Sequence, residues 1–393
     1  MIIRKAVPED NQRAREISAI CFEFSLRPQP ADAVPEEEKF YRLVALTDDE
    51  TEMMGTITVN DYQIQFDGHS CRMGGIGSVA TLPQYRRQGC IRACFNAALE
   101  DMYAAGYDFS YLYPFSTAYY RKFGYESCVQ RVSVRVQLDT LSPPAADGTL
   151  CLAESKNPLT DAIRTVDRFW ESRFNLMVQH TQDDYSWTAK LNPAAQEEYT
   201  YVYFSDDGTP KAYSTFRSED RSLRCSRFYF TDKEGFNGLM QLFKSMSSDH
   251  RAVQFMLPAV SSMQYLLPEL ALESVECTCQ TIGMVRIINA KSALEKAKYR
   301  GSGSITLKIN DLQISQNNRT YAITFAGGRA VSVKETDNEP DALLNIPAFS
   351  ALLMGAADFE DAGAFLSGIE IKNENACFRQ VFYSKKMMIA DFF

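Results

Sequence analysis

The alternation of apolar and polar residues along the chain predicts three successive patterns of strands and helices. The first begins with a strand at 2–4 and an amphipathic helix that ends at Phe22. Further strands are expected at 41–47, 55–62 and 108–113. The segment GIGSVATLPQYRRQGCIRACFNAALEDMYAAG predicts a strand, a tight loop and a helix. Gly106 is typical of a helix end, and a short helix ending at Gly124 completes the pattern.

The second and third patterns differ in their order of elements. Residues 151–283 predict a helix at 159–174, strands at 199–204, 211–217, 223–230 and 252–257, and a helix at 234–247. This order echoes the first pattern and suggests a diverged internal duplication. From Val285 onward, strands at 305–311, 321–327 and 330–335 precede helices at 342–354 and 362–366. Prolines and turn residues at 141–150 mark a boundary, so the expected domains are 1–140, 150–284 and 285–393.

These patterns predict a fold class of α/β and α+β. Two tandem α/β units with mixed sheets should precede an α+β domain, because strands and helices segregate in the last pattern. The length of 393 residues agrees with two or three domains, and the hydrophobic fraction of 45% supplies material for several cores. A charged fraction of 23% is close to average globular usage, which excludes a disordered or fibrous chain.

Charge and cysteine usage narrow the possible partners. Lys and Arg total 41 against 50 Asp and Glu, a net charge of −9, so we expect neither nucleic acid nor a membrane as a partner. The 10 cysteines and 3 histidines show no metal-ligand spacing, which predicts no metal and a reducing cytoplasm. The N-terminal MIIRKAVPED is charged and is typical of a strand followed by a turn, so we expect no secretory signal there. The weakly polar stretch at 348–357 is too short to span a membrane.

The most informative segment is the turn Arg86, Arg87, Gln88, Gly89, Cys90, Ile91, Arg92 between an expected strand and an expected helix. A helix start presents unpaired N–H groups and the positive end of the helix dipole, which suit a pyrophosphate. Gly89 permits close approach of the backbone, and the arginines add charge. An ordinary solvated helix start is the alternative for such a loop taken alone.

The surrounding residues resemble motifs A and B of the GCN5-related N-acetyltransferase (GNAT) superfamily. The resemblance rests on VATLPQYRRQGCIRA, the following strand and YYRKFGYE, with Ile91 standing where the family has Gly or Ala. The whole chain, with a second unit that lacks the phosphate loop and a C-terminal domain similar to sterol carrier protein, resembles the enhanced-intracellular-survival (Eis) acetyltransferases. That resemblance implies two GNAT-type units, acetyl-CoA as cosubstrate, and N-acetylation of aminoglycoside-like or lysine-type amines in a ternary complex. It also implies a homo-oligomer, a hexamer.

The resemblance also assigns roles to residues. Val79, Ala80 and Thr81 would pair with the pantetheine arm and polarise the thioester carbonyl, and residues 86–92 would hold the pyrophosphate. The Tyr120 hydroxyl would protonate the departing thiolate. With an ordinary pKa of about 10 it stays protonated at neutral pH. The alternative for Tyr120 is a packing role.

The acceptor pocket and the chain end complete the expected site. A cationic amine favours acidic and aromatic neighbours, and the candidates are Phe22, Glu23 and Phe24, with 36–38 as an acidic run that is more typical of a solvated surface. The chain ends in MMIADFF, so we expect the end to be packed, and the resemblance implies that the Phe393 carboxylate takes a proton from the amine. Asp391 would share this part of the site. The alternative is that the two terminal phenylalanines fill a hydrophobic gap.

A second function remains open from the sequence. A lipid or hydrophobic-ligand binding protein would use the C-terminal domain and would keep the GNAT unit as a structural part. The charged residues Lys308, Asp311, Arg329 and Lys334 in the C-terminal strands favour the acetyltransferase instead.

Overall fold

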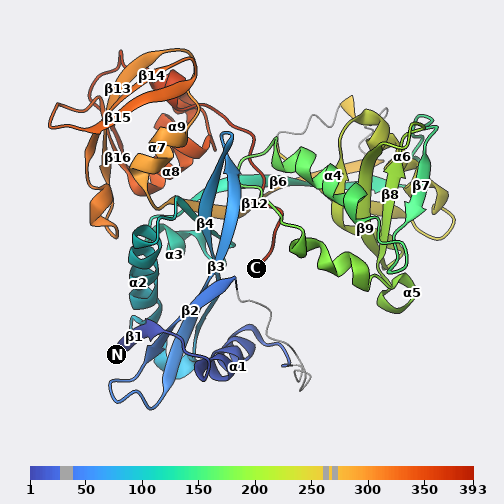
Figure 1. Ribbon diagram of the computed structural model, residues 1–393, viewed down its shortest axis with the longest axis horizontal. Helices are drawn as coiled ribbons and strands as arrows, with labels where there is room; N and C mark the ends of the chain where they lie inside the picture. The colour runs from blue at the N-terminus through green and yellow to red at the C-terminus, as the bar shows by residue number, and fades with distance from the viewer. Residues whose placement is uncertain (27–38, 260–264, 268–272) are drawn as a thin grey trace. The chain divides into compact units, whose positions relative to one another are not determined.

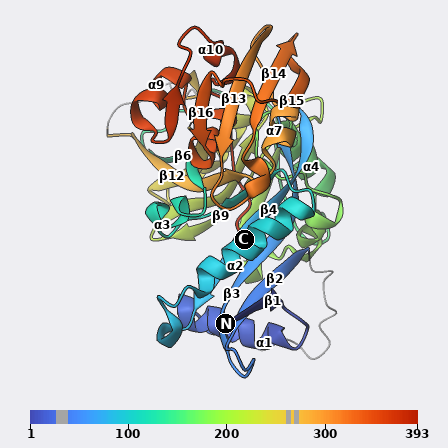
Figure 2. The same cartoon turned by 90° about the vertical axis from the view of Figure 1, so that its left-hand side faces the viewer.

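The computed structural model describes residues 1–26, 39–259, 265–267 and 273–393, and its contacts define two compact units (Figures 1 and 2). The first unit comprises Met1–Val129, Ile282–Lys385 and Ala390–Phe393. The second comprises Gln130–Thr281 and Lys386–Ile389. The chain therefore leaves each unit and returns to it later, so sequence order and structural unit do not coincide.

The first unit contains a mixed sheet in the order β1-β2-β3-β4-β5-β12, in which β4 and β5 run parallel and the other neighbours antiparallel. Its strands are β1 (Ile2–Lys5), β2 (Phe40–Leu46), β3 (Met53–Phe66), β4 (His69–Thr81), β5 (Phe109–Leu112) and the end of β12 (Val275–Ile287). Its helical elements are α1 (Asp10–Phe22), η1 (Pro83–Tyr85), α2 (Cys90–Ala104) and α3 (Thr117–Arg121).

Helices α1 and α2 cover opposite faces of this sheet. In β2, Leu43 and Ala45 pack in the cluster that contains the apolar side of α2, whereas Val44 and Leu46 pack with Ala14 and Ile17 of α1. Successive side chains of a strand point to opposite faces, so this alternation separates the two helices. Figure 2 shows α2 lying across the strands. The sheet is thus buried on both sides.

The second unit repeats this topology with its own strands. Its sheet runs β6-β11-β10-β9-β8-β7, and the parallel pair is β10 and β11. The strands are β6 (Glu126–Gln137), β7 (Thr149–Leu152), β8 (Tyr199–Phe204), β9 (Pro210–Glu219), β10 (Ser222–Phe230) and β11 (Ala252–Pro258). The helical elements are α4 (Thr160–Glu171), η2 (Asp183–Lys190), α5 (Pro193–Gln196) and α6 (Lys233–Ser245).

The edge strands of the two sheets are exchanged along the chain. Strand β6 starts in the first unit but completes the sheet of the second, and β12 starts in the second unit but completes the sheet of the first. The first sheet therefore lacks one strand until the chain has passed through the second unit, whereas the strands β6 to β11 of the second sheet follow one another in sequence.

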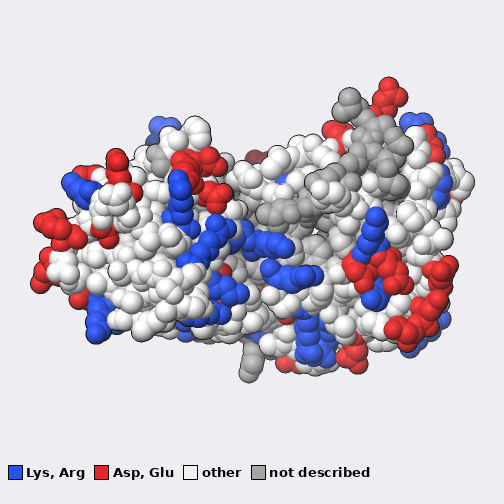
Figure 3. Space-filling model, turned by 90° about the horizontal axis from the view of Figure 1, so that it is seen from above, with Lys and Arg blue, Asp and Glu red and all other residues white. Residues whose placement is uncertain are grey.

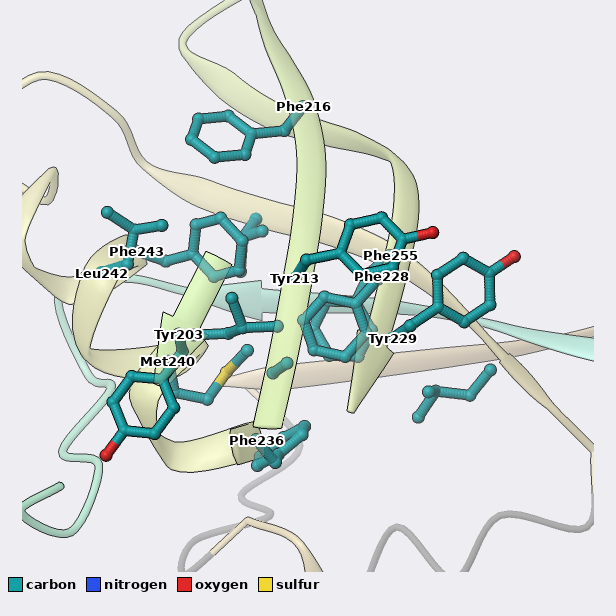
Figure 4. Packing of buried hydrophobic residues seen from close by; sticks show 14 of the residues in the cluster. Tyr203, Tyr213, Phe216, Phe228, Tyr229, Phe236, Met240, Leu242, Phe243 and Phe255 are labelled. Atoms are coloured by element: carbon teal, nitrogen blue, oxygen red, sulfur yellow. The ribbon is translucent and has the colours of Figure 1, made fainter. Parts of the chain in front are cut away.

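Aromatic side chains fill the core of the second unit (Figure 4). The rings of Phe228 and Phe255 stack with centroids 4.1 Å apart, and Phe236 meets Phe228 edge to face at 5.9 Å. Phe243 lies beside Phe216 at 5.3 Å. Offset and edge-to-face geometries are the favourable ones for such pairs. This core belongs to the second unit alone.

The rest of the first unit is a C-terminal α+β domain that follows β12. Its sheet has the order β15-β14-β13-β16-β17, and only β13 and β16 are parallel. The strands are β13 (Gly303–Asn310), β14 (Thr320–Ala326), β15 (Arg329–Glu335), β16 (Ala342–Asn345) and β17 (Ile369–Ile371). The helical elements are α7 (Ala290–Lys296), η4 (Ser315–Asn317), α8 (Ile346–Met354), α9 (Phe359–Phe365) and α10 (Phe378–Val381).

Three ion pairs join this domain to the strands and turns of the first sheet. Lys296 Nζ lies 2.7 Å from both carboxylate oxygens of Asp108, just before β5. Lys385 Nζ lies 2.6 Å from Asp67 Oδ2, at the β3–β4 turn, with both side chains buried. The third pair, Arg286 and Asp311, is fully buried. Breaking such a pair leaves an uncompensated charge, so each contact fixes the domain in place.

Two sequence expectations about elements are corrected by the structure. Residues 342–345 are a strand rather than the start of a helix, because they pair with β13 and β17. Helix α8 starts after Asn345, whose side chain accepts a hydrogen bond from the Ala348 N–H at 2.9 Å. The strand expected at 55–62 is longer, because β3 and β4 form a hairpin that turns at Asp67 and Gly68. Within the described residues, no helix is long and apolar enough to cross a membrane.

Candidate active site

The candidate site lies where the two parallel strands of the first unit end. The β4–β5 ladder runs from Met73 opposite Phe109 to Ile76 opposite Leu112, and there it stops. Strand β4 continues to Thr81, paired only with β3. Beyond Ile76, the edge of β4 that faced β5 therefore has no strand partner, and Val79, Ala80 and Thr81 lie on this part of β4.

A bulge bends β4 just after the ladder ends. Thr56 of β3 pairs with Ala80 and Thr58 with Gly77, so Ser78 and Val79 together face the single residue Ile57. Ser78 adopts a left-handed backbone with φ of +49°. A bulge kinks its strand and increases the local twist, and here it separates the end of β4 from the direction of β5.

The loop after β4 carries exposed arginines into an uncapped helix start. Arg86, Arg87, Gln88 and Gly89 are exposed, and α2 begins directly after Gly89. Gly89 has φ of +87°, and a side chain added at its position would meet no atom within 4 Å. No side chain caps the first turn of α2. Arg92 follows on α2 and is also exposed, whereas Cys90 is buried and Ile91 half-buried.

The corresponding helix of the second unit has the opposite chemistry. Helix α6 follows β10 and precedes the parallel strand β11, as α2 follows β4 and precedes β5. Its N-cap is Asp232, whose Oδ1 accepts a hydrogen bond from the Gly235 N–H at 3.0 Å. A carboxylate therefore occupies the N–H groups and the positive helix end that α2 leaves open.

Tyr120 lies on α3, immediately after β5. Its side chain is 2% exposed and packs edge to face on Phe95 of α2 at 5.9 Å. Its hydroxyl makes no hydrogen bond to any described residue. Burial, helped by the neighbouring Tyr119 and Tyr125 hydroxyls, raises the pKa of Tyr120 well above 10, so the phenol stays protonated at every ordinary pH.

The end of the chain returns to the same strand. The ring of Phe393 lies between Tyr62 of β3 and Tyr111 of β5, with centroids 5.6 and 5.2 Å away. An added side chain at Gly75 would come within 2.8 Å of this ring, and one at Gly77 within 3.4 Å of the terminal carboxyl group. The Phe393 carboxylate thus lies against β4 one residue beyond the end of the β4–β5 ladder.

Three tyrosines around this chain end were not among the residues expected from the sequence. Tyr111 is fully buried, and its hydroxyl has no hydrogen-bond partner among the described residues. Burial, with the charge of Asp391 as the next cause, raises its pKa well above 10. Tyr113 donates to the Asp391 backbone carbonyl at 2.5 Å, and Tyr62 packs on Phe393. The sequence carried one signal for this cluster: Tyr111 in β5 and Tyr113 just after it are two positions apart, a spacing that places side chains on the same face of a strand.

The residues expected to contact the acceptor make fewer contacts with the rest of the site than Tyr120 and Phe393 do. Cys21, at the end of α1, donates to the Thr81 carbonyl at a distance of 3.3 Å, which brings the end of α1 beside the end of β4. Phe22, Glu23 and Phe24 follow and are exposed, and no hydrogen bond or ring contact in the described part of the chain links them to Tyr120 or Phe393. Residues 36–38 lie outside the described residues. Asp391 is half-buried.

The net charge of −9 is not gathered as one acidic surface on the face that Figure 3 shows. Acidic and basic side chains both occur there. Among the described residues, no group of His, Cys, Asp or Glu is placed to hold a metal ion.

Comparison with protein families identifies the domains. Residues 2–128 and 176–287 each match an acetyltransferase (GNAT) domain, and residues 290–385 match a sterol carrier protein domain. The chain therefore belongs to the GNAT acetyltransferases, an enzyme family, and has the Eis-like arrangement of two GNAT units and a C-terminal sterol-carrier-like domain. The expected fold class is confirmed. No curated protein matches the chain.

Solved structures with the same fold cover the whole chain. A GCN5-related N-acetyltransferase from Anabaena variabilis is 18% identical with a TM-score of 0.84, and covers 100% of both chains. A probable N-acyltransferase from Enterococcus faecalis is 19% identical with a TM-score of 0.83, over 98% of this chain and 97% of that one. Eis1 from Mycobacterium abscessus is 16% identical with a TM-score of 0.79, over 100% of both. At these identities, the likeness concerns the fold.

The packing of Phe393 against Gly75 leads to a testable prediction. Replacing Gly75 with Ala should displace the ring, because the new Cβ would overlap it at 2.8 Å. Carboxypeptidase A, followed by mass spectrometry, should release Phe393 faster from the Gly75→Ala protein than from the wild type. Ser70→Ala, at an exposed position of the same strand, should behave as wild type. Equal release from all three proteins would contradict this placement of the ring.

Proposed function

We propose that the protein transfers the acetyl group of acetyl-CoA to an amine, either of an aminoglycoside-like small molecule or of a lysine side chain. The observation that carries this proposal is the position of the Phe393 carboxylate against Gly77, where β4 has lost its β5 partner and leads toward the arginine-bearing loop. A base at this point would face any group that takes the place of β5 along the edge of β4.

The residues present are suited to acetyl-CoA. The free edge at Val79, Ala80 and Thr81 offers backbone groups to the amide-containing pantetheine arm. Residues 86–92, with Gly89 at an uncapped helix start, offer N–H groups and positive charge to the pyrophosphate. The carboxylate cap at Asp232 argues against a second such site, so we propose one acetyl-CoA per chain.

The transfer we propose is a direct attack in a ternary complex. Acetyl-CoA supplies the acetyl group as a thioester. The neutral amine attacks the carbonyl carbon, so a C–N bond forms and the C–S bond breaks. The Phe393 carboxylate accepts the proton that the amine loses, and Tyr120 donates its phenolic proton to the departing sulfur. Exchange with solvent then restores both groups.

The two groups suit these roles at neutral pH. A terminal carboxyl group is ionised there and can accept a proton. Tyr120 is protonated at neutral pH, because the ordinary pKa of a phenol is about 10 and burial raises it further. Phe22, Glu23, Phe24 and Asp391 are the proposed contacts of the acceptor, where an anion and aromatic faces favour a cationic amine.

Other parts of the proposal follow from the family resemblance. We propose domains at 1–140, 150–284 and 285–393, a cytoplasmic location and assembly as a hexamer. Exposed apolar side chains of the C-terminal domain, such as Leu312 and Val331, supply surface for subunit contacts. The lipid-binding alternative gains no support from the described C-terminal strands, since Ile305, Leu307 and Ile309 are at most 2% exposed and pack as core.

The phosphate loop is tested by removing its charges. Arg86→Ala together with Arg87→Ala should raise the KM for acetyl-CoA about tenfold or more for each residue, because each charge-assisted contact is worth about 1.5–3 kcal/mol. The matched control is Lys291→Ala with Lys308→Ala, which removes two exposed charges elsewhere. Calorimetry should find one CoA per wild-type chain. Unchanged CoA affinity in the arginine variant would refute the loop assignment.

The proposed acid is tested by Tyr120→Phe. This variant should keep the fold and the affinity for CoA but lose about 10²–10⁴-fold in kcat, because the phenol proton is no longer available. Tyr119→Phe is the control, since the adjacent ring is half-buried and also packs on Phe115. An unaltered kcat in Tyr120→Phe, with chemistry rate-limiting, would leave this side chain only a packing role.

The proposed base is tested at the chain end. A Gly-Ser extension after Phe393 keeps the ring but moves the free carboxylate, and should lower kcat/KM for the amine about 100-fold or more. Phe393→Leu keeps a terminal carboxylate and an apolar side chain, and should retain most activity. The opposite result, with the extension active and Phe393→Leu inactive, would show that the ring is needed and the carboxylate is not.

A further inference from the structure

The turn that follows Tyr120 is contacted by Arg286 of β12, which is paired with the C-terminal domain, and by a loop of that domain. Arg286 of β12 is 0% exposed, and its Nη1 donates to the Phe123 carbonyl at 2.8 Å. Its Nη2 lies 2.8 Å from both carboxylate oxygens of Asp311, in the loop after β13. A guanidinium held by a carboxylate on one side and a carbonyl on the other has little freedom to move.

The turn has a backbone that accommodates this guanidinium. Gly124 has φ of +83°, and a side chain there would lie 1.6 Å from Arg286 Nη1. Only glycine fits this combination of positive φ and close approach. The end of the Tyr120 helix is therefore shaped around a residue that lies far away in the sequence.

A second contact from the same loop holds the preceding residue. Gln313 Nε2 donates to the Lys122 carbonyl at 2.8 Å. The loop is itself ordered by Asp311, whose carboxylate accepts from the Gln313 and Ile314 N–H groups at 2.9 and 3.1 Å and from Asn317 Nδ2 at 2.9 Å. Successive carbonyls, at Lys122 and Phe123, thus both receive a donor from beyond residue 280.

We propose that Arg286 and Gln313 are positioning residues for Tyr120, so that the sterol-carrier-like domain is part of the acetyltransferase site. This inference rests on the proposed role of Tyr120 as acid. Helix α3 has 5 residues, too few to be stable alone, and it depends on contacts at its ends. The Ser116 hydroxyl accepts from the Tyr119 N–H at one end, and Arg286 and Gln313 donate at the other. Small displacements of a catalytic group reduce rate strongly.

Gln313→Ala is the most direct test. It removes the hydrogen bond to the Lys122 carbonyl and a longer one, at 3.4 Å, that Gln313 Oε1 accepts from Arg286 Nη1, while Arg286 keeps Asp311 and the Phe123 carbonyl as partners. Gln313 is half-buried, so the variant should fold with little change in melting temperature. We expect kcat to fall about three- to tenfold, with the KM for acetyl-CoA unchanged. Gln316→Ala is the matched control: this residue lies in the same loop, is exposed, and is hydrogen-bonded only to Ser315 among the described residues.

A double-mutant cycle separates positioning from a general structural effect. Once Tyr120 is Phe, adding Gln313→Ala should reduce kcat no further, because the misplaced group is already absent. If both single variants lower kcat and the two losses multiply in the double variant, the positioning role is overturned. A normal kcat in Gln313→Ala, with a low kcat in Tyr120→Phe, overturns the positioning role alone. A normal kcat in Tyr120→Phe overturns the proposed acid, and this inference with it.

Discussion

The fully buried ion pair between Arg286 and Asp311 is the contact around which the first unit is organised. Arg286 belongs to β12, the strand that completes the first sheet after the chain has formed the second unit, and Asp311 orders the loop that follows β13. A buried pair of charges is costly unless each charge is fully hydrogen-bonded. Asp311 meets this condition with bonds from two backbone N–H groups and Asn317. Arg286 donates to the Phe123 carbonyl through Nη1, while its buried Nε has no hydrogen-bond partner among the described residues. The pair therefore stabilises only one arrangement of strand, loop and turn.

The two GNAT units share one sheet topology but differ at the start of the helix that follows β4 in the first unit and β10 in the second. Both sheets have the same order of parallel and antiparallel neighbours, yet the two equivalent helix starts differ in one decisive residue. Gly89 leaves the N–H groups of α2 open, whereas Asp232 places a carboxylate on those of α6. The second unit thus has the same fold and carries the start of β12, the strand that the first sheet requires, while the Asp232 carboxylate occupies the start of its helix α6.

The packing of the chain end likewise depends on residues far away in the sequence. A terminal carboxylate placed in a protein needs a surrounding that holds it without neutralising it, and here two rings and a glycine-bearing strand provide the place. Gly75 and Gly77 leave room for Phe393 because a side chain at either position would press on the ring or the carboxyl group. Tyr62 and Tyr111 hold the ring by aromatic contact. The glycines of β4 therefore have a packing reason that lies at the opposite end of the sequence.

The sequence by itself determined the features that local chemistry decides. Apolar periodicity predicted most of the helices and strands, and the loop at 86–92 was recognisable because its glycine and arginines are adjacent in the chain. Local rules failed where long-range pairing prevailed, as at 342–345, which the pairing with β13 and β17 makes a strand. Tertiary structure alone decided the strand exchange, the meeting of Phe393 with Tyr111, and the contact of Arg286 with Phe123. Each of these contacts joins residues far apart in sequence. Arg286 in particular lies in a strand whose pattern gives no sign of a buried charge. Its burial depends on the partner Asp311, which only the folded C-terminal domain brings to it.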